Sequence, residues 1–263
     1  MAPVRPKVTL MLTDDEPTYH APRHILEQGG NMSDPTVVIP NRRQILRAML
    51  ASATAVAAGA TAFELAAPPQ LRAQSKLTPD AAAKQLVDGN QRFAANQLTS
   101  IQQDLEVLKS RTAEKQEPFA AVLACADSRV PVELIFDQTI GQVFVTRVAG
   151  NLVTPEIIAS LEYAVAVLGV EVILVLGHTN CGAVKAALTA GTVPGQISAL
   201  YPPLRRAAEE SGGDLAKAIA VNSRVQAELL RTSSTVIREA IKAAKVKVIS
   251  GVYDLASGKV TLT

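Results

Sequence analysis

The sequence predicts a single α/β domain, in which helices flank a mostly parallel central β-sheet. Short, largely apolar runs occur at residues 119–124, 143–148 and 170–176, and such runs are typical of strands buried on both faces of a parallel sheet. Segments with helical spacing separate these runs, and that alternation favours parallel strands joined by helices. The length of 263 residues suits one sizeable domain plus a tail.

The first predicted element of the domain is a helix that begins after Thr78 and forms an N-terminal helical arm. Thr78 can cap this helix and Pro79 suits its first turn, while Leu86, Val87 and Phe93 supply an apolar stripe. The other elements follow in chain order. Helices are expected at 101–112, 155–168, 181–190 and 215–244, a strand at 246–253, and an edge strand at the C-terminus at 259–262.

Residues 1–73 are predicted to be an N-terminal extension with a twin-arginine signal peptide, which leaves 74–263 as the folded domain. Arg42 and Arg43 precede an uncharged, alanine-rich run at 48–63. A basic pair followed by a short, mildly apolar run is typical of such signals. The run is also shorter than the roughly 20 residues that span a bilayer.

We therefore expect export by the twin-arginine route to the periplasm or another extracytoplasmic compartment. Cleavage after Ala73 would leave a mature protein without stable membrane insertion. Met32 is an alternative start to Met1. The other interpretations of the extension are a soluble alanine-rich helix and a signal anchor that stays attached. The formal charge is +2, with no block of like charges, so no nucleic-acid partner is expected.

Two polar clusters follow predicted strands. Cys125, Asp127 and Arg129 follow the first strand, and His178 and Cys181 follow the third. Because the carboxyl ends of parallel strands line the ligand crevice, the two clusters can meet. Two thiolates and one imidazole suit zinc, and three protein ligands leave the open position of a catalytic zinc site. A Cys125–Cys181 disulfide is the rival interpretation, since two cysteines in an exported protein usually pair.

The spacing of Asp127 and Arg129 adds to the metal hypothesis. A carboxylate two residues from a ligand can orient a metal-bound hydroxide, and Arg129 can hold that carboxylate with a bidentate pair. Alone, this spacing would indicate an ordinary turn salt bridge. Beside three metal ligands, the functional interpretation is favoured.

The segments Cys-Ala-Asp-Ser-Arg-Val at 125–130 and His-Thr-Asn-Cys-Gly-Ala at 178–183 resemble the Cys-x-Asp-x-Arg and His-x-x-Cys motifs of the β-class carbonic anhydrases. The similarity covers roughly residues 78–262. It includes pocket positions of the family at Gln116, Phe144, Ala149 (within Arg147–Asn151) and Tyr163, and closing strands at 251–260.

The resemblance implies one Zn²⁺ per subunit, bound by Cys125, His178 and Cys181, with Asp127 and Arg129 as the catalytic dyad. The implied reaction is attack of zinc-bound hydroxide on carbon dioxide, giving bicarbonate and a proton. It further implies a homodimer or higher homo-oligomer, in which a partner subunit donates some residues of the substrate pocket. That pocket would consist of Gln116, Phe144, Ala149 and Tyr163.

One subgroup of the family closes its resting site by letting the aspartate ligate zinc, so Asp127 is a candidate fourth ligand in a closed state. The regulatory bicarbonate pocket of that subgroup contains a tryptophan. This chain has Val122 three residues before Cys125 and no tryptophan. We therefore expect an open resting site.

Three other functions are compatible with parts of the pattern. Relatives of the family hydrolyse carbonyl sulfide or carbon disulfide with nearly the same chemistry. A non-catalytic zinc-binding bicarbonate sensor would keep the metal but lose a ligand or a dyad residue, and none is lost here. A disulfide-stapled binding protein would hold no metal.

Overall fold

The computed structural model describes residues 77–103 and 105–263, which belong to one compact unit. The predicted extension, its signal peptide and the domain boundary at 73/74 lie outside the described residues. No helix in the described part of the chain combines the length and apolar character needed to cross a membrane.

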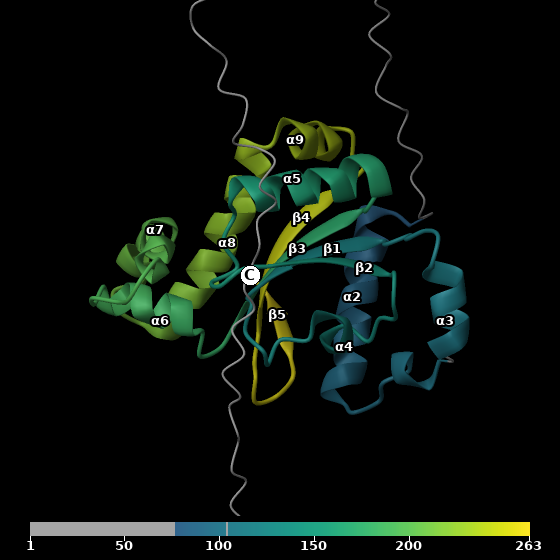
Figure 1. Cartoon of the computed structure of the whole chain (residues 1–263), viewed down its shortest axis with the longest axis horizontal. Helices are drawn as coiled ribbons and strands as arrows, with labels where there is room; N and C mark the ends of the chain where they lie inside the picture. The colour runs from purple at the N-terminus through teal and green to yellow at the C-terminus, as the bar shows by residue number, and fades with distance from the viewer. Residues whose placement is uncertain (1–76, 104) are drawn as a thin grey trace, which may run out of the picture. The chain divides into compact units, whose positions relative to one another are not determined.

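The core of the unit is a five-stranded sheet with the strand order β2-β1-β3-β4-β5 (Figure 1). The first four strands in this order run parallel, and β5 pairs antiparallel with β4 at the edge. The predicted fold class is therefore confirmed. The strands are β1 (Ala120–Ala124), β2 (Val143–Arg147), β3 (Val172–His178), β4 (Lys247–Tyr253) and β5 (Val260–Leu262).

Helices cover both faces of the sheet, which explains why the inner strands β1 and β3 are buried along their whole length. In β1, Val122 and Ala124 point into a cluster that includes Leu86 of helix α2. Ala121 and Leu123 point into the opposite cluster, which includes residues of α8 and α9. The helices are α2 (Pro79–Ala94), α3 (Leu105–Thr112), α4 (Val132–Ile135), α5 (Pro155–Tyr163), α6 (Gly182–Thr189), α7 (Tyr201–Ser211), α8 (Leu215–Ser233) and α9 (Thr235–Lys242).

The start of α2 agrees with its prediction. Thr78 Oγ1 accepts a hydrogen bond from Ala81 N at 3.2 Å, and Pro79 occupies the first turn. The predicted helix at 155–168 is also found, although its end, Ala164–Leu168, widens into a π-helical turn. Gly169 ends it with a φ of 73°, a left-handed conformation that favours glycine.

Three predicted elements differ from the structure. The third strand is shifted to Val172–His178 and so carries His178 as its last residue. The stretch expected at 101–112 consists of a short 3₁₀ turn at Ser100–Gln102 and the separate helix α3. The stretch at 215–244 is divided into α8 and α9 at Ser234, because Ser234 Oγ accepts a hydrogen bond from Ile237 N and caps the second helix.

Helix α8 packs very closely against β3 just before His178. A Cβ atom added at Gly177 would lie 2.4 Å from Ser223 Oγ and 3.2 Å from Ile219 Cγ2. No side chain fits in that space. Gly177 therefore permits the contact between the strand and the helix.

Candidate metal centre

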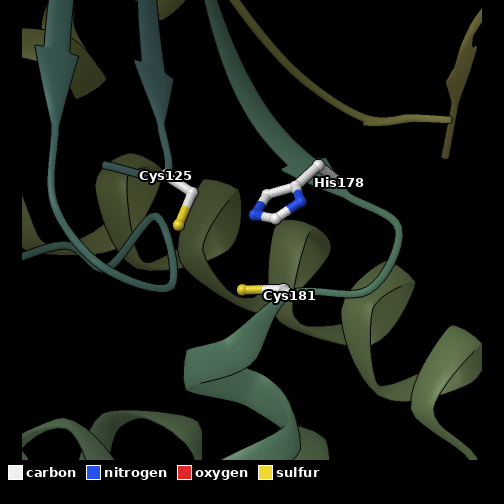
Figure 2. Close-up of side chains that lie close together, drawn as sticks. All are labelled: Cys125, His178 and Cys181. Atoms are coloured by element: carbon white, nitrogen blue, oxygen red, sulfur yellow. The ribbon is translucent and has the colours of Figure 1, made fainter. Parts of the chain in front are cut away.

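Three candidate ligands converge at the carboxyl end of the sheet. Cys125 follows β1, His178 ends β3, and Cys181 immediately precedes α6. Their ligand atoms lie within 4.8 Å of one another and all three residues are buried. Figure 2 shows the two sulfur atoms and the imidazole pointing toward one common space. Both thiols are free, so the structure does not contain the disulfide of the rival interpretation.

The imidazole of His178 is oriented for metal binding. Its Nδ1 lies 2.9 Å from the carbonyl oxygen of Thr179. A carbonyl can only accept a hydrogen bond, so Nδ1 carries the hydrogen and the neutral ring has its lone pair on Nε2. Nε2 is buried and has no hydrogen-bond partner among the described residues. A buried nitrogen without a partner, next to two sulfur atoms, fits a zinc ion.

The surroundings favour the thiolate at Cys125 and the thiol at Cys181. The Cys181 thiol, His178 and the Gly150 N–H, which donates to Cys125 Sγ at 3.3 Å, lower the pKa of Cys125 to about 4, although burial opposes the shift. The Cys125 thiolate and burial raise the pKa of Cys181. Burial acts to lower the pKa of His178, but the Cys125 thiolate outweighs it and raises that pKa. The site is therefore prepared for a cation.

Asp127 and Arg129 form a two-point ion pair beside the ligands. Asp127 Oδ1 accepts from Arg129 Nε at 2.9 Å and from the Arg129 backbone N–H at 2.9 Å, and Oδ2 accepts from Nη2 at 2.8 Å. Arg129 holds the pKa of the Asp127 carboxyl well below its usual range. The Asp127 side chain is 17% exposed, and its Oδ2 lies 3.7 Å from His178 Nε2. The carboxylate is thus ionised and faces the space between the ligands.

Arg147, the last residue of β2, holds the turn between Cys125 and Asp127. Its Nε donates to the Cys125 carbonyl oxygen at 2.9 Å, and its Nη2 donates to the Asp127 carbonyl oxygen. Arg147 thereby fixes the backbone that carries one candidate ligand and the carboxylate.

The four predicted pocket residues are not brought together in one chain. Ala149 adjoins Gly150, which contacts Cys125. Gln116 is exposed and precedes β1, whereas Cys125 follows it, so about 16 Å of strand lies between them. Phe144 pairs with Ala121 near the start of β1.

The ring of Phe144 lies 6.3 Å from that of Tyr163, centroid to centroid. Tyr163 is 46% exposed. The donation of pocket residues by a partner subunit stays a prediction.

The motif pattern did not point to two further residues of the site. Asn222 and Gln226 on α8 are buried and hydrogen-bond to the loop that follows β2. Their signal in the sequence is a pair of amides four residues apart on a mostly apolar helix face. That signal predicts buried polar contacts but not their partners.

The comparisons with known proteins agree with this geometry. The family model described as carbonic anhydrase matches residues 120–260, a range that contains all three candidate ligands. The structure also resembles that of a β-carbonic anhydrase from Sordaria macrospora, with a TM-score of 0.55 and 30% identity, over 58% of this chain and 84% of that one. The chain belongs to the β-class carbonic anhydrase family.

Relatives within the family cover most of the described domain. The chain is 41% identical over 194 residues to a carbonic anhydrase of Mycolicibacterium smegmatis, over 70% of this chain and 93% of that protein. It is 48% identical over 120 residues to carbonic anhydrase 2 of Mycobacterium tuberculosis, over 44% of this chain and 58% of that protein. The β-carbonic anhydrase CafA of Aspergillus fumigatus has a similar structure, with a TM-score of 0.57 and 28% identity, over 70% of this chain and 89% of that one.

Proposed function

We propose that this β-class carbonic anhydrase catalyses the reversible hydration of carbon dioxide to bicarbonate and a proton, with one zinc ion per subunit. The supporting observation is the buried cluster of Cys125, His178 and Cys181 beside an ionised Asp127. Zinc in a site of this kind lowers the pKa of bound water to near 7 and supplies hydroxide at neutral pH.

The protein's own groups would orient the reaction. Asp127 can accept a hydrogen bond from the attacking hydroxyl and so direct the oxygen lone pair at carbon dioxide. Arg129 keeps Asp127 ionised and fixes its direction through both carboxylate oxygens. Thr179 keeps the imidazole of His178 in the tautomer that leaves Nε2 free.

We further propose that the resting site is open. Both oxygens of Asp127 accept hydrogen bonds from Arg129, and this two-point pairing competes with ligation of a metal by the same carboxylate. Absorption spectra of the cobalt-substituted protein, recorded between pH 7 and 9, would test this proposal. The proposal would be contradicted if the spectrum at pH 7 were that of cobalt with four protein ligands, and changed at higher pH to that of cobalt with three.

We propose a homodimer or a higher homo-oligomer as the functional form. The related structure from Sordaria macrospora is described as tetrameric. Gln116 precedes β1 and Phe144 pairs with Ala121 near its start, whereas Cys125 follows the end of that strand. A pocket completed by a partner subunit would account for this separation. Sedimentation velocity of the purified protein tests this, and a fully active monomer would contradict it.

The extension is proposed to direct twin-arginine export to the periplasm, on the evidence of the sequence at 1–73 alone. Export after zinc loading would protect the thiols from an oxidising compartment. Replacement of Arg42 and Arg43 by lysine should keep the unprocessed chain inside the cell. N-terminal sequencing of the exported protein would locate the cleavage site.

Stopped-flow measurement of carbon dioxide hydration, with zinc content determined on the same sample, tests the main proposal. We expect one zinc per chain and fast hydration, with hydration lost in Asp127→Ala while zinc is kept. Asp88→Asn, at an exposed carboxylate paired with Lys84, is the control. Zinc without hydration would favour a sulfur substrate or a sensor, and oxidised cysteines without zinc would refute the proposal.

A further inference from the structure

A pair of amide side chains on α8, Asn222 and Gln226, lies behind the loop that contacts Cys125. Each residue is 1% exposed, and they lie one helical turn apart, so their side chains are neighbours. Neither residue has a part in the chemistry proposed above. Buried amides are nearly always hydrogen-bonded, and their partners therefore indicate what they hold in place.

The directions of the hydrogen bonds in this network are fixed by its two ends. Val153 N–H can only donate, so it bonds Gln226 Oε1, at 2.8 Å. Gln226 Nε2 then donates to Asn222 Oδ1 at 3.1 Å. This leaves Asn222 Nδ2 to donate to the Gly150 carbonyl, which can only accept, at 2.8 Å. Neither amide can rotate by 180° without losing bonds at both of its ends.

Gly150 connects this network to the metal ligand. Its carbonyl oxygen is bound by Asn222, while its own N–H donates to Cys125 Sγ at 3.3 Å. The φ of Gly150 is +78°, a conformation that strains other residues. The carbonyl and the N–H flank the same Cα atom. The contact with Asn222 therefore restrains the direction in which the N–H points.

We propose that Asn222 and Gln226 are positioning residues that direct the Gly150 N–H at the Cys125 sulfur and thereby set the affinity of the metal site. The N–H stabilises the negative charge of the thiolate and restrains the sulfur in the direction of the other two ligands. This inference rests on the proposed function, since it requires Cys125 to bind zinc. Outer hydrogen-bond partners of this kind change metal affinity by about 10- to 100-fold.

Two substitutions test the network in the full chain. Asn222→Leu removes the donor to Gly150 and keeps the branched shape of the side chain. Gln226→Met removes the acceptor for Val153 and keeps an unbranched side chain of similar length. Ser211→Ala is the matched control, since Ser211 is also buried but its hydroxyl bonds the Ala208 carbonyl and the Gly213 N–H at the end of α7. The zinc dissociation constant is measured under reducing conditions by competition with a chromophoric chelator. The thiolate-to-cobalt absorption band of the cobalt form is the second readout.

We expect zinc binding about 10- to 100-fold weaker in Asn222→Leu and Gln226→Met, together with a shifted cobalt band. The Ser211→Ala variant should match the wild type in both readouts. Folded variants with wild-type affinity and an unchanged band would overturn the inference. Failure of both variants to fold would also overturn it, because the network would then serve folding rather than the site.

A wild-type protein that binds neither zinc nor cobalt would refute the proposed function and this inference together. That result differs clearly from tight wild-type binding that the substitutions leave unchanged.

Discussion

Arg129 holds Asp127 at two points, with 2.9 Å from Nε to Oδ1 and 2.8 Å from Nη2 to Oδ2. A lysine could keep the charge but not the two-point geometry, because its ammonium group is a single compact donor. We therefore expect Arg129→Lys to lower the rate of carbon dioxide hydration by about 10- to 100-fold while zinc content stays the same.

Stopped-flow hydration and metal analysis on one sample provide the measurement for Arg129→Lys. The control is Arg205→Lys, at an exposed position 3.8 Å from Glu209. Equal rates in wild type and Arg129→Lys would show that a positive charge at position 129 supports hydration without the two-point geometry.

Proton release is expected to depend on the buffer. His178 is the single histidine in residues 74–263, and it is a candidate metal ligand, so this part of the chain has no second imidazole to carry protons away. At pH 7.5 the maximal hydration rate should rise several-fold as an imidazole buffer is raised from about 1 to 50 mM and then level off. A rate indifferent to buffer concentration would indicate a relay within the protein.

Asp137 should make stability depend on pH. Burial acts to raise its pKa, but donors from Thr99, Ser100 and Arg92 outweigh burial and hold the pKa well below its usual range. A carboxyl with a lowered folded-state pKa stabilises the protein above the unfolded-state pKa of about 4, and this stabilisation is lost as the pH falls toward the folded value.

Asp137→Asn should lower the free energy of unfolding at pH 7 by about 1–3 kcal/mol, and the difference from wild type should narrow between pH 5 and pH 3. Urea unfolding at several pH values measures it. The exposed Glu209→Gln variant serves as control. A difference in the free energy of unfolding that stays constant with pH would show that the lowered pKa of Asp137 is not its cause.

Ser234 joins two helices through one hydroxyl. It accepts from Ile237 N at 3.0 Å, which caps α9, and donates to Glu162 Oε1 at 2.6 Å. Ser234→Ala should lower the free energy of unfolding by about 1–2 kcal/mol, the usual cost of a lost N-cap. Thermal or urea unfolding provides the measurement. Ser160→Ala, which removes a bond only to the Glu156 carbonyl of its own helix, should cost less.

Removal of zinc should leave the domain folded. Cys125 and His178 lie at the ends of paired strands in the core, so the fold does not depend on a metal as that of a zinc finger does. After treatment with chelator we expect unchanged far-UV circular dichroism, a lower melting temperature and two thiols that react with a thiol reagent. Loss of the circular dichroism signal would contradict this prediction.

The strands were predictable because their burial leaves a direct trace in the sequence. Runs that are apolar throughout indicate strands covered on both faces, and β1 and β3 are buried along their whole length. The order in which the strands pair was not predicted. Helix α7 was not predicted, since Pro202 and Pro203 look like the end of an element. They occupy the first helical turn instead, where a missing N–H costs nothing.

The candidate metal ligands were predictable from local motifs, whereas their supporting contacts were not. Cys125, Asp127 and Arg129 are near neighbours in the sequence, and their spacing is informative by itself. The hydrogen bond from Asn222 to Gly150 joins residues 72 positions apart. Such a contact depends on how α8 lies against the sheet, and no pattern within α8 specifies that.

Gly177, the residue before His178, affects the position of a whole helix. The distance between α8 and β3 is set by the missing methyl group of Gly177, because Ser223 and Ile219 occupy that space. A Gly177→Ala substitution would push the helix outward, and Asn222 and Gln226 would move with it. One added carbon atom on β3 would thus change the contacts that α8 makes with the loop after β2.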